Sequence, residues 1–318
     1  MKIAALFPGQ GSQEVGMGTD FLNGDDKKWF ENVDDQLSFS LLELLENGPA
    51  EKLERTRYTQ PALFTVSHLI YRYLSRNFSD FNFYAGHSLG EYNALAAGGW
   101  ADFEELLPVV VARGKAMDEQ AQQVEGSMAA VLKMDREPLE EFCAEISADE
   151  SIEGTVEVAL FNSPGQSVVS GSEAANEAAV ERARDAGALK AVSLDVSGPW
   201  HSRYMEPVRE ELAAVLGDVD WQEGRTYLPN TSGVLREGGS PEQFLIDQLV
   251  QPVDWVGTLQ TLFEGGCSHF VEIGPGNVLS GLVKRTARKY DVEPEIYQTD
   301  NLEQTQKTVE AIKNAADR

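Results

Sequence analysis

A serine between two glycines is the residue of this chain that is best placed to do chemistry. Ser88 lies in the run GHSLG at 86–90, between the apolar residues 83–85 and the helix-forming residues 91–97. Flanking glycines let the backbone turn sharply from strand into helix, so that the serine is exposed and helix N–H groups face an oxyanion. The pattern predicts a nucleophile elbow whose serine attacks a carbonyl carbon. The alternative is a serine that only caps the helix, because serine is a preferred N-cap residue.

A nucleophilic serine needs a base, and the chain offers four histidines. His68 falls within a predicted helix and His269 begins a predicted strand, so we expect both to pack within the fold. His87 directly precedes the serine, and we expect it to line the site because adjacent side chains diverge on a tight turn. His201, in a loop after a strand, is therefore the candidate base, with helix capping as the alternative. No third member of the site can be chosen among 52 acidic residues.

Arg113 follows the apolar run 109–112 and has two interpretations. As a surface helix residue, it would pack its apolar stem on the protein and extend its charge into water. As a binding residue, it would offer a substrate carboxylate a bidentate fork that lysine cannot match. The residues alone leave these two interpretations equally supported.

Composition narrows the class of protein. The chain has 318 residues, of which 42% are hydrophobic, and its predicted strands and helices alternate, which is typical of α/β enzymes. The two cysteines, Cys143 and Cys267, have neither metal-ligand nor disulfide-framework spacing, which favours the reducing cytoplasm and predicts no metal site. The apolar runs are too short for an export signal or for a membrane span of ~20 residues.

The charge is strongly acidic, because 26 Lys and Arg face 52 Asp and Glu and give a net charge of -26. This balance argues against nucleic acid as a partner, since phosphate binding relies on a basic face. Acidic residues concentrate at 43–54, 135–157 and 206–223, as on a solvated surface. One hypothesis is adaptation to a salt-rich cytoplasm, where screening shortens the reach of self-repulsion.

The middle of the chain predicts a small unit with its own order of elements: strand 128–132, helix 136–146, strands 156–161 and 167–171, helix 173–186 and strand 191–196. The order β-α-β-β-α-β is that of a ferredoxin-like unit. We expect this subdomain, 127–196, to be inserted into a larger α/β body made of 1–126 and 197–318.

In the larger body, a turn-rich segment after the first strand leads to a helix predicted over 59–74, with Pro61 early in it. Near the other end of the chain, a strand predicted at 269–273 precedes a helix over 278–290.

Several motifs follow one another along nearly the whole chain: FPGQGSQ at 7–13, TQPA at 59–62, GHSLGEY at 86–92, RG at 113–114, NSPGQ at 162–166, PWHS at 199–202, Gln248, PVDW at 252–255 and EIGPG at 272–276. Taken together, they resemble the malonyl-CoA:acyl carrier protein transacylases and, more broadly, the acyltransferase domains of fatty acid and polyketide synthases. The resemblance implies an α/β-hydrolase-like large subdomain with an inserted ferredoxin-like (βαββαβ) small subdomain.

The resemblance also implies roles for single residues. Ser88 would carry the acyl ester, and His201 would act as its base and later as its acid. A backbone carbonyl near Gln248 would orient this base in place of an aspartate, which fits the lack of an identifiable acidic partner. Gln10 and Leu89 would supply the N–H groups of the oxyanion hole.

By the same resemblance, Arg113 would hold the free carboxylate of a malonyl group. The implied reaction is a ping-pong transfer in which Ser88 attacks malonyl-CoA, coenzyme A leaves, and the phosphopantetheine thiol of an acyl carrier protein takes the acyl group for fatty acid synthesis. No metal or bound cofactor is required, and a monomer is adequate.

Two residues depart from the pattern of the family. Asn93 stands where many relatives carry a small hydroxyl residue, as in some freestanding acyltransferases that serve polyketide synthases. Trp200 is bulkier than the usual Ser or Phe and would crowd branched acyl groups, which favours malonyl over methylmalonyl.

Three alternative functions remain open: an acyltransferase serving a polyketide synthase, an acyl-thioester hydrolase, and a docking protein with a decayed site. Arg113 argues against a lipase, because a buried cation is out of place among neutral fatty chains. Since carrier proteins are acidic, docking calls for a basic patch on this acidic chain. The candidates are Lys284, Arg285, Arg288 and Lys289, or else Arg182, Arg184 and Lys190, with ordinary surface charge as the alternative.

Overall fold

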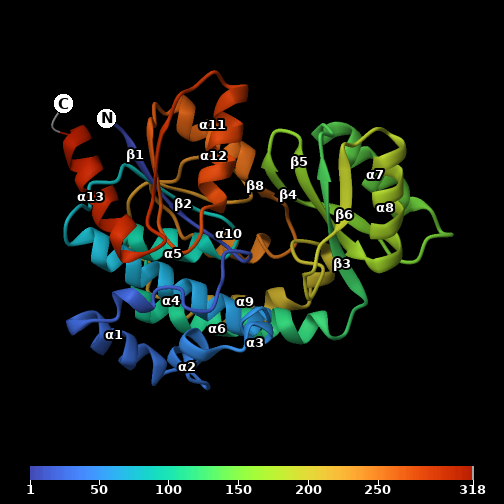
Figure 1. Ribbon diagram of the computed structural model, residues 1–318. Helices are drawn as coiled ribbons and strands as arrows, with labels where there is room; N and C mark the ends of the chain where they lie inside the picture. Colours follow the sequence, from blue (N-terminus) through green and yellow to red (C-terminus); the bar gives the residue numbers. More distant parts are fainter. Residues whose placement is uncertain (317–318) are drawn as a thin grey trace.

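The computed structural model describes residues 1–316 and contains two β-sheets, one in each of two subdomains (Figure 1). The larger sheet has the strand order β10-β9-β1-β2-β7, and all its pairings are parallel. Its strands are β1 (Ile3–Phe7), β2 (Phe83–Gly86), β7 (Tyr227–Leu228), β9 (His269–Glu272) and β10 (Glu295–Gln298). Every residue of β1 is buried, as expected for the central strand of a parallel sheet covered on both faces.

Helices pack on both faces of the larger sheet (Figure 1). Ile3 and Phe7 of β1 belong to the core formed with α4, α5 and α6, whereas Ala4 and Leu6 belong to the core formed with α11 and α12. This subdomain contains helices α1 (Gly24–Asp34), α2 (Leu41–Asn47), α3 (Ala50–Leu53), α4 (Thr56–Ser75), α5 (Gly90–Gly98), α6 (Phe103–Ala121), α9 (Val208–Leu216), α10 (Glu242–Asp247), α11 (Trp255–Glu264), α12 (Val278–Lys289) and α13 (Leu302–Ala316), with 3₁₀ turns η1 (Thr19–Phe21) and η2 (Arg203–Met205).

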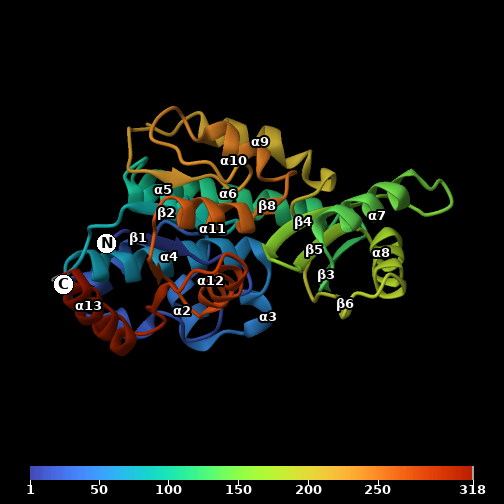
Figure 2. The same cartoon turned by 90° about the horizontal axis from the view of Figure 1, so that it is seen from above.

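The smaller sheet has the order β6-β3-β5-β4-β8 and lies at one end of the larger body, with α7 and α8 on its outer side (Figure 2). Its elements are β3 (Gly126–Leu132), α7 (Arg136–Ala148), β4 (Val156–Ser163), β5 (Gln166–Ser172), α8 (Glu173–Asp185), β6 (Lys190–Ser193) and β8 (Val253–Asp254). The first four strands pair antiparallel, so the β-α-β-β-α-β unit and the α/β fold class predicted from the sequence are confirmed. The sequence did not predict β8, which comes from the larger body and runs parallel to β4.

Two other features differ from the prediction. The stretch predicted to be turn-rich contains α1, α2 and α3. The helix predicted over 59–74 begins at Thr56, so Pro61 is its sixth residue. Thr56 and Thr59 are fully buried in this first turn, and their low helix propensity conceals the true start of the helix in the sequence. Within residues 1–316, every helix is too short or too polar to cross a bilayer.

Candidate active site

Ser88 lies in the turn between β2 and α5, and its own backbone makes the sharp bend. Its φ is 51°, in the left-handed region that side chains other than glycine seldom adopt. Gly86 and Gly90 serve close packing: a Cβ on Gly90 would lie 2.1 Å from the Phe7 carbonyl oxygen, and one on Gly86 would lie 1.9 Å from Gly90. The predicted elbow is therefore present, and its glycines press the turn against the end of β1.

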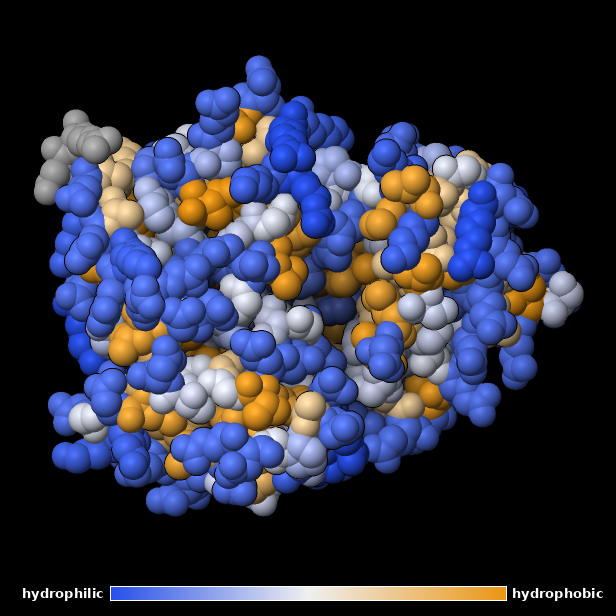
Figure 3. All heavy atoms as spheres, viewed as in Figure 1, coloured by the Kyte–Doolittle hydropathy of each residue, from blue (hydrophilic) through white to orange (hydrophobic). Residues whose placement is uncertain are grey.

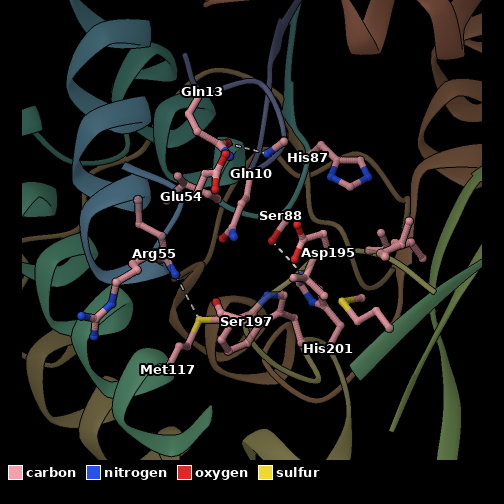
Figure 4. A pocket seen from close by; sticks show the side chains of 18 of the residues that line it. Gln10, Gln13, Glu54, Arg55, His87, Ser88, Met117, Asp195, Ser197 and His201 are labelled. Atoms are coloured by element: carbon pink, nitrogen blue, oxygen red, sulfur yellow. Dashed lines mark hydrogen bonds between the residues drawn. The ribbon is translucent and has the colours of Figure 1, made fainter. Parts of the chain in front are cut away.

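Ser88 and His201 point toward each other across the site (Figure 4). Ser88 Oγ lies 2.8 Å from His201 Nε2, and His201 Nδ1 lies 2.7 Å from the backbone carbonyl oxygen of Gln248. Because a carbonyl can only accept, Nδ1 must carry the hydrogen, which leaves the Nε2 lone pair free to take the serine proton. His201 also has a left-handed backbone, with φ 56°, so both members of the pair are held in an unusual conformation.

The environment of His201 keeps its imidazole neutral. The side chain is buried, and this burial, reinforced by the nearby Arg113 guanidinium, lowers the pKa of His201 to about 3. The imidazole is therefore neutral at pH 7, with a lone pair on Nε2 that faces Ser88 Oγ.

Arg113 is 1% exposed, which excludes the interpretation as a surface residue. It comes from α6, and its Nη1 donates to Gln60 Oε1 at 2.6 Å while Nη2 donates to Gln248 Oε1 at 2.9 Å. Nη2 also lies 3.5 Å from Ser88 Oγ. No carboxylate of residues 1–316 forms an ion pair with Arg113, and its Nε is a buried donor without an acceptor. The guanidinium therefore retains both its charge and free donors beside Ser88 Oγ.

A pocket of about 650 Å³ joins these groups. In Figure 3 it is the hollow between the two subdomains. It is lined by the sequence-predicted residues Gln10, His87, Ser88, Leu89, Arg113 and His201. Gln248 does not line the pocket; it lies behind the wall and supports the base through its carbonyl group. His87 Nε2 lies 2.8 Å from Asn162 Oδ1, away from the serine hydroxyl.

The backbone N–H groups of Gln10 and Leu89 donate to no group in the part of the chain that the structure describes. The N–H of Ser88, in contrast, is taken by Asn230 Oδ1 at 2.6 Å. Gln10 and Leu89 both line the pocket together with Ser88, so their free N–H groups are candidates for an oxyanion hole.

The other two histidines lie outside the pocket, as expected. His68 stacks on Phe103 with 4.5 Å between ring centroids, and His269 stacks on Tyr297 at 6.1 Å.

Sequence reasoning missed three buried residues that hold the site together. Gln60, which stands in the TQPA motif, accepts a hydrogen bond from Arg113. Asn230 accepts from the backbone N–H of Ser88 in the elbow, and Glu91 accepts from the side chain of Gln248. A single Asn after a two-residue strand gives no local signal. Glu91 is part of the GHSLGEY motif, but its burial cannot be seen in an acidic sequence.

Comparisons with known proteins identify the family of the chain. The family model for the acyl transferase domain matches residues 5–317. The malonyl CoA-acyl carrier protein transacylase of Bacillus subtilis (strain 168) is 40% identical over 292 residues, which cover 91% of this chain and 91% of that protein.

Two solved structures are similar over nearly their full length. The acyl-carrier-protein S-malonyltransferase of Burkholderia pseudomallei 1710b superposes with a TM-score of 0.90 at 34% identity, covering 98% of this chain and 100% of that one. A malonyl transacylase in complex with a type II polyketide synthase acyl-carrier protein gives 0.91 at 32% identity, with coverages of 98% and 100%. A half-buried serine bonded to a buried histidine, beside an arginine that has no ion-pair partner in residues 1–316, thus coincides on this two-subdomain fold with a match over nearly the whole sequence, and the chain belongs to the acyl transferase domain family.

Proposed function

We propose that this protein transfers a malonyl group from malonyl-CoA, through an ester on Ser88, to the phosphopantetheine thiol of an acyl carrier protein, for fatty acid synthesis. The observation that carries the proposal is Arg113, a buried cation without an ion-pair partner in residues 1–316, 3.5 Å from the nucleophile. An acyl group that ends in a carboxylate would supply the missing negative charge. The malonyltransferase names of the relatives support the same substrate.

In the first half-reaction, Ser88 Oγ attacks the thioester carbonyl while His201 Nε2 takes the hydroxyl proton. The N–H groups of Gln10 and Leu89 stabilise the oxyanion of the tetrahedral intermediate. When this intermediate collapses, the carbon–sulfur bond breaks and the coenzyme A thiolate takes the proton from His201. The product is a malonyl ester of Ser88.

In the second half-reaction, the carrier thiol gives its proton to His201 and attacks the ester carbonyl. The carbon–oxygen bond to Ser88 then breaks, and His201 returns the proton to Oγ. The same base thus serves both halves, and Gln248 holds its Nδ1–H throughout.

Trp200 supports a preference for the unbranched malonyl group. Trp200, Met117 and Met128 all line the pocket, and all three residues are buried. A methyl branch on the acyl group would have to displace these packed side chains.

For the carrier protein, we favour the patch on α12 formed by Lys284, Arg285, Arg288 and Lys289. Within residues 1–316, none of these four forms an ion pair with an acidic side chain, whereas Arg182 pairs with Glu145 and Arg184 donates to a backbone carbonyl. Arg285 donates to Gln166 of the smaller subdomain, so this helix contacts both subdomains, which supports the choice of patch. Figure 3 shows strongly hydrophilic side chains beside the hollow, where α12 lies in Figure 1.

We also propose a cytoplasmic monomer, with subdomain boundaries at 1–126 with 197–318 and at 127–196. The buried free thiols of Cys143 and Cys267 support a reducing compartment.

A second candidate function is supply of malonyl groups to a polyketide synthase. It is favoured by the likeness to a transacylase solved with a type II polyketide synthase carrier.

The test is intact-mass measurement of the protein mixed separately with malonyl-CoA, acetyl-CoA and methylmalonyl-CoA, beside a Ser88→Ala control. We expect a malonyl adduct that is absent from Ser88→Ala and that passes to added carrier protein. Release of free malonate without an adduct would indicate a hydrolase instead. Offering carriers from a fatty acid synthase and from a polyketide synthase separates the two candidate functions.

A further inference from the structure

A carboxyl group with no role in the reaction described above lies behind the pocket wall. Glu91 is fully buried and does not line the pocket. Its Oε2 accepts from the side-chain Nε2 of Gln248 at 2.6 Å and from the backbone N–H of Asn230 at 3.2 Å. Its Oε1 has no hydrogen-bond partner in residues 1–316. One oxygen therefore receives two hydrogen bonds from two different segments.

The first of these segments supports the base. Gln248 accepts the Nδ1–H of His201 at its backbone carbonyl, so a displacement of this backbone would redirect the imidazole. Its side-chain amide is fixed on both sides, because Oε1 accepts from Arg113 and Nε2 donates to Glu91. Nε2 is also 3.1 Å from the carbonyl oxygen of Ser88.

The second segment supports the nucleophile. Asn230 is buried, and its side chain spans the elbow: Oδ1 accepts from the N–H of Ser88 at 2.6 Å, and Nδ2 donates to the carbonyl of Gly86 at 2.6 Å. These two bonds hold the left-handed conformation of the serine from both sides.

We propose that Glu91 is a positioning residue that keeps base and nucleophile in register, because its Oε2 joins the support of His201 to the support of Ser88. This inference rests on the proposed function. Burial raises the pKa of Glu91 to about 7, so its protonated and ionised forms are both populated near neutral pH. What the site needs from Glu91 is an acceptor at a fixed place, which an amide also supplies.

The test compares two variants of Glu91 with the wild type by the rate of malonyl-adduct formation at saturating malonyl-CoA. Glu91→Ala removes the acceptor, and we expect the saturating rate to fall by about 100-fold, as for misplaced reacting groups, with KM changed by less than about threefold. Glu91→Gln keeps an oxygen for both donors and puts its NH₂ where Oε1 lacks a partner. We expect it to restore the rate to within about threefold of the wild type.

The control is Glu272→Ala. Glu272 is buried as well, and its carboxyl group accepts the N–H groups of Leu279 and Ser280 at the start of α12, outside the pocket. We expect it to lower the melting temperature while the saturating rate remains that of the wild type.

Three results would overturn the inference: a wild-type saturating rate in Glu91→Ala, a Glu91→Gln protein as slow as Glu91→Ala, or an equal loss in Glu272→Ala. If circular dichroism shows Glu91→Ala to be unfolded, Glu91→Asp takes its place, because it keeps a carboxyl group but is one methylene too short. Absence of a malonyl adduct in the wild type would instead refute the proposed function.

Discussion

Arg113 brings a positive charge to the nucleophile that acetyl groups cannot neutralise and malonyl groups can. For Arg113→Ala, we expect the ratio of kcat/KM for malonyl-CoA to that for acetyl-CoA to fall by about 10- to 100-fold, the range for losing a charge-assisted hydrogen-bonded pair. Acetyl transfer itself should improve, because the guanidinium also lowers the pKa of His201. Adduct formation with each donor measures this, and an unchanged ratio would refute the binding role. Arg113→Lys keeps the positive charge but loses the two-pronged guanidinium. We expect its ratio of kcat/KM to lie between those of the wild type and Arg113→Ala.

The low pKa of His201 makes a prediction for the pH dependence. Since this pKa is lowered from 6.5 to about 3, the neutral base is present in the free enzyme throughout the range above pH 5. We expect kcat/KM for adduct formation from malonyl-CoA, which reports the free enzyme, to show no acidic limb centred near 6.5. Stopped-flow acylation between pH 5 and 8 measures this, and a tenfold loss per unit below 6.5 would contradict it.

Ser88 and His201 could be singled out from the sequence because their signals are local. Ser88 stands in a five-residue motif, and His201 follows from elimination among four histidines. Asn230 and Glu91 were not predictable as parts of the site, because their contacts join distant segments: Asn230 binds the N–H of a residue 142 positions away. The roles of Ser88, His201, Arg113, Gln10, Leu89 and Gln248 all remain predictions, which the geometry supports.

At the scale of elements, the contact between the elbow and β1 depends on Gly90. For Gly90→Ala, the new Cβ would lie 2.1 Å from the Phe7 carbonyl oxygen, so the turn or the strand must move. We expect a loss of stability of about 1–3 kcal/mol and a large loss of malonyl-adduct formation. The matched control is Gly281→Ala in α12, where the Cβ meets no atom within 4 Å. It should gain up to about 1 kcal/mol from helix propensity and acylate normally. Urea unfolding measures the stability of each variant, and intact mass measures its malonyl adduct. Normal acylation by Gly90→Ala would contradict the prediction.

The basic patch on α12 should act on the second half-reaction only. For the double variant Lys284→Glu with Arg288→Glu, we expect transfer from the preformed malonyl-enzyme to a limiting amount of carrier protein to slow by at least about threefold at low salt, and less at high salt. Acylation by malonyl-CoA should be unaffected. Arg182→Glu, on the smaller subdomain, is the control. If transfer is slower in this variant but not in the α12 variant, the carrier protein docks on the smaller subdomain and not on α12.

Periodicity and turn residues were enough to predict the smaller subdomain, because its elements follow one another in sequence and pair as neighbours. The helices α1, α2 and α3 were missed, since α2 and α3 have only seven and four residues and give little periodic signal. The subdomain boundaries remain a prediction.

For the molecule as a whole, the net charge of -26 predicts salt-dependent stability. Repulsion among exposed carboxylates opposes the compact state, and salt shortens its reach from about 10 Å at 0.1 M to about 3 Å at 1 M. We expect the melting temperature to rise steeply between 0.1 and 2 M KCl. Calorimetry in KCl, beside sucrose as a compacting solute that does not screen charge, measures this. A melting temperature that does not change with KCl would contradict the hypothesis of a salt-rich cytoplasm.

The two-residue strand β8 has a consequence for protein engineering. It pairs with Leu160 and Phe161 of β4, and its Asp254 is bridged by Arg136 of the smaller subdomain at 2.9 Å. In a chimera that exchanges 127–196 alone between relatives, β4 would come from one protein and β8 from the other. The contacts between these two strands, including the Arg136–Asp254 ion pair, would then join residues of different origin. The transplantable module is consequently discontinuous in the gene and includes 252–255 as a second cassette.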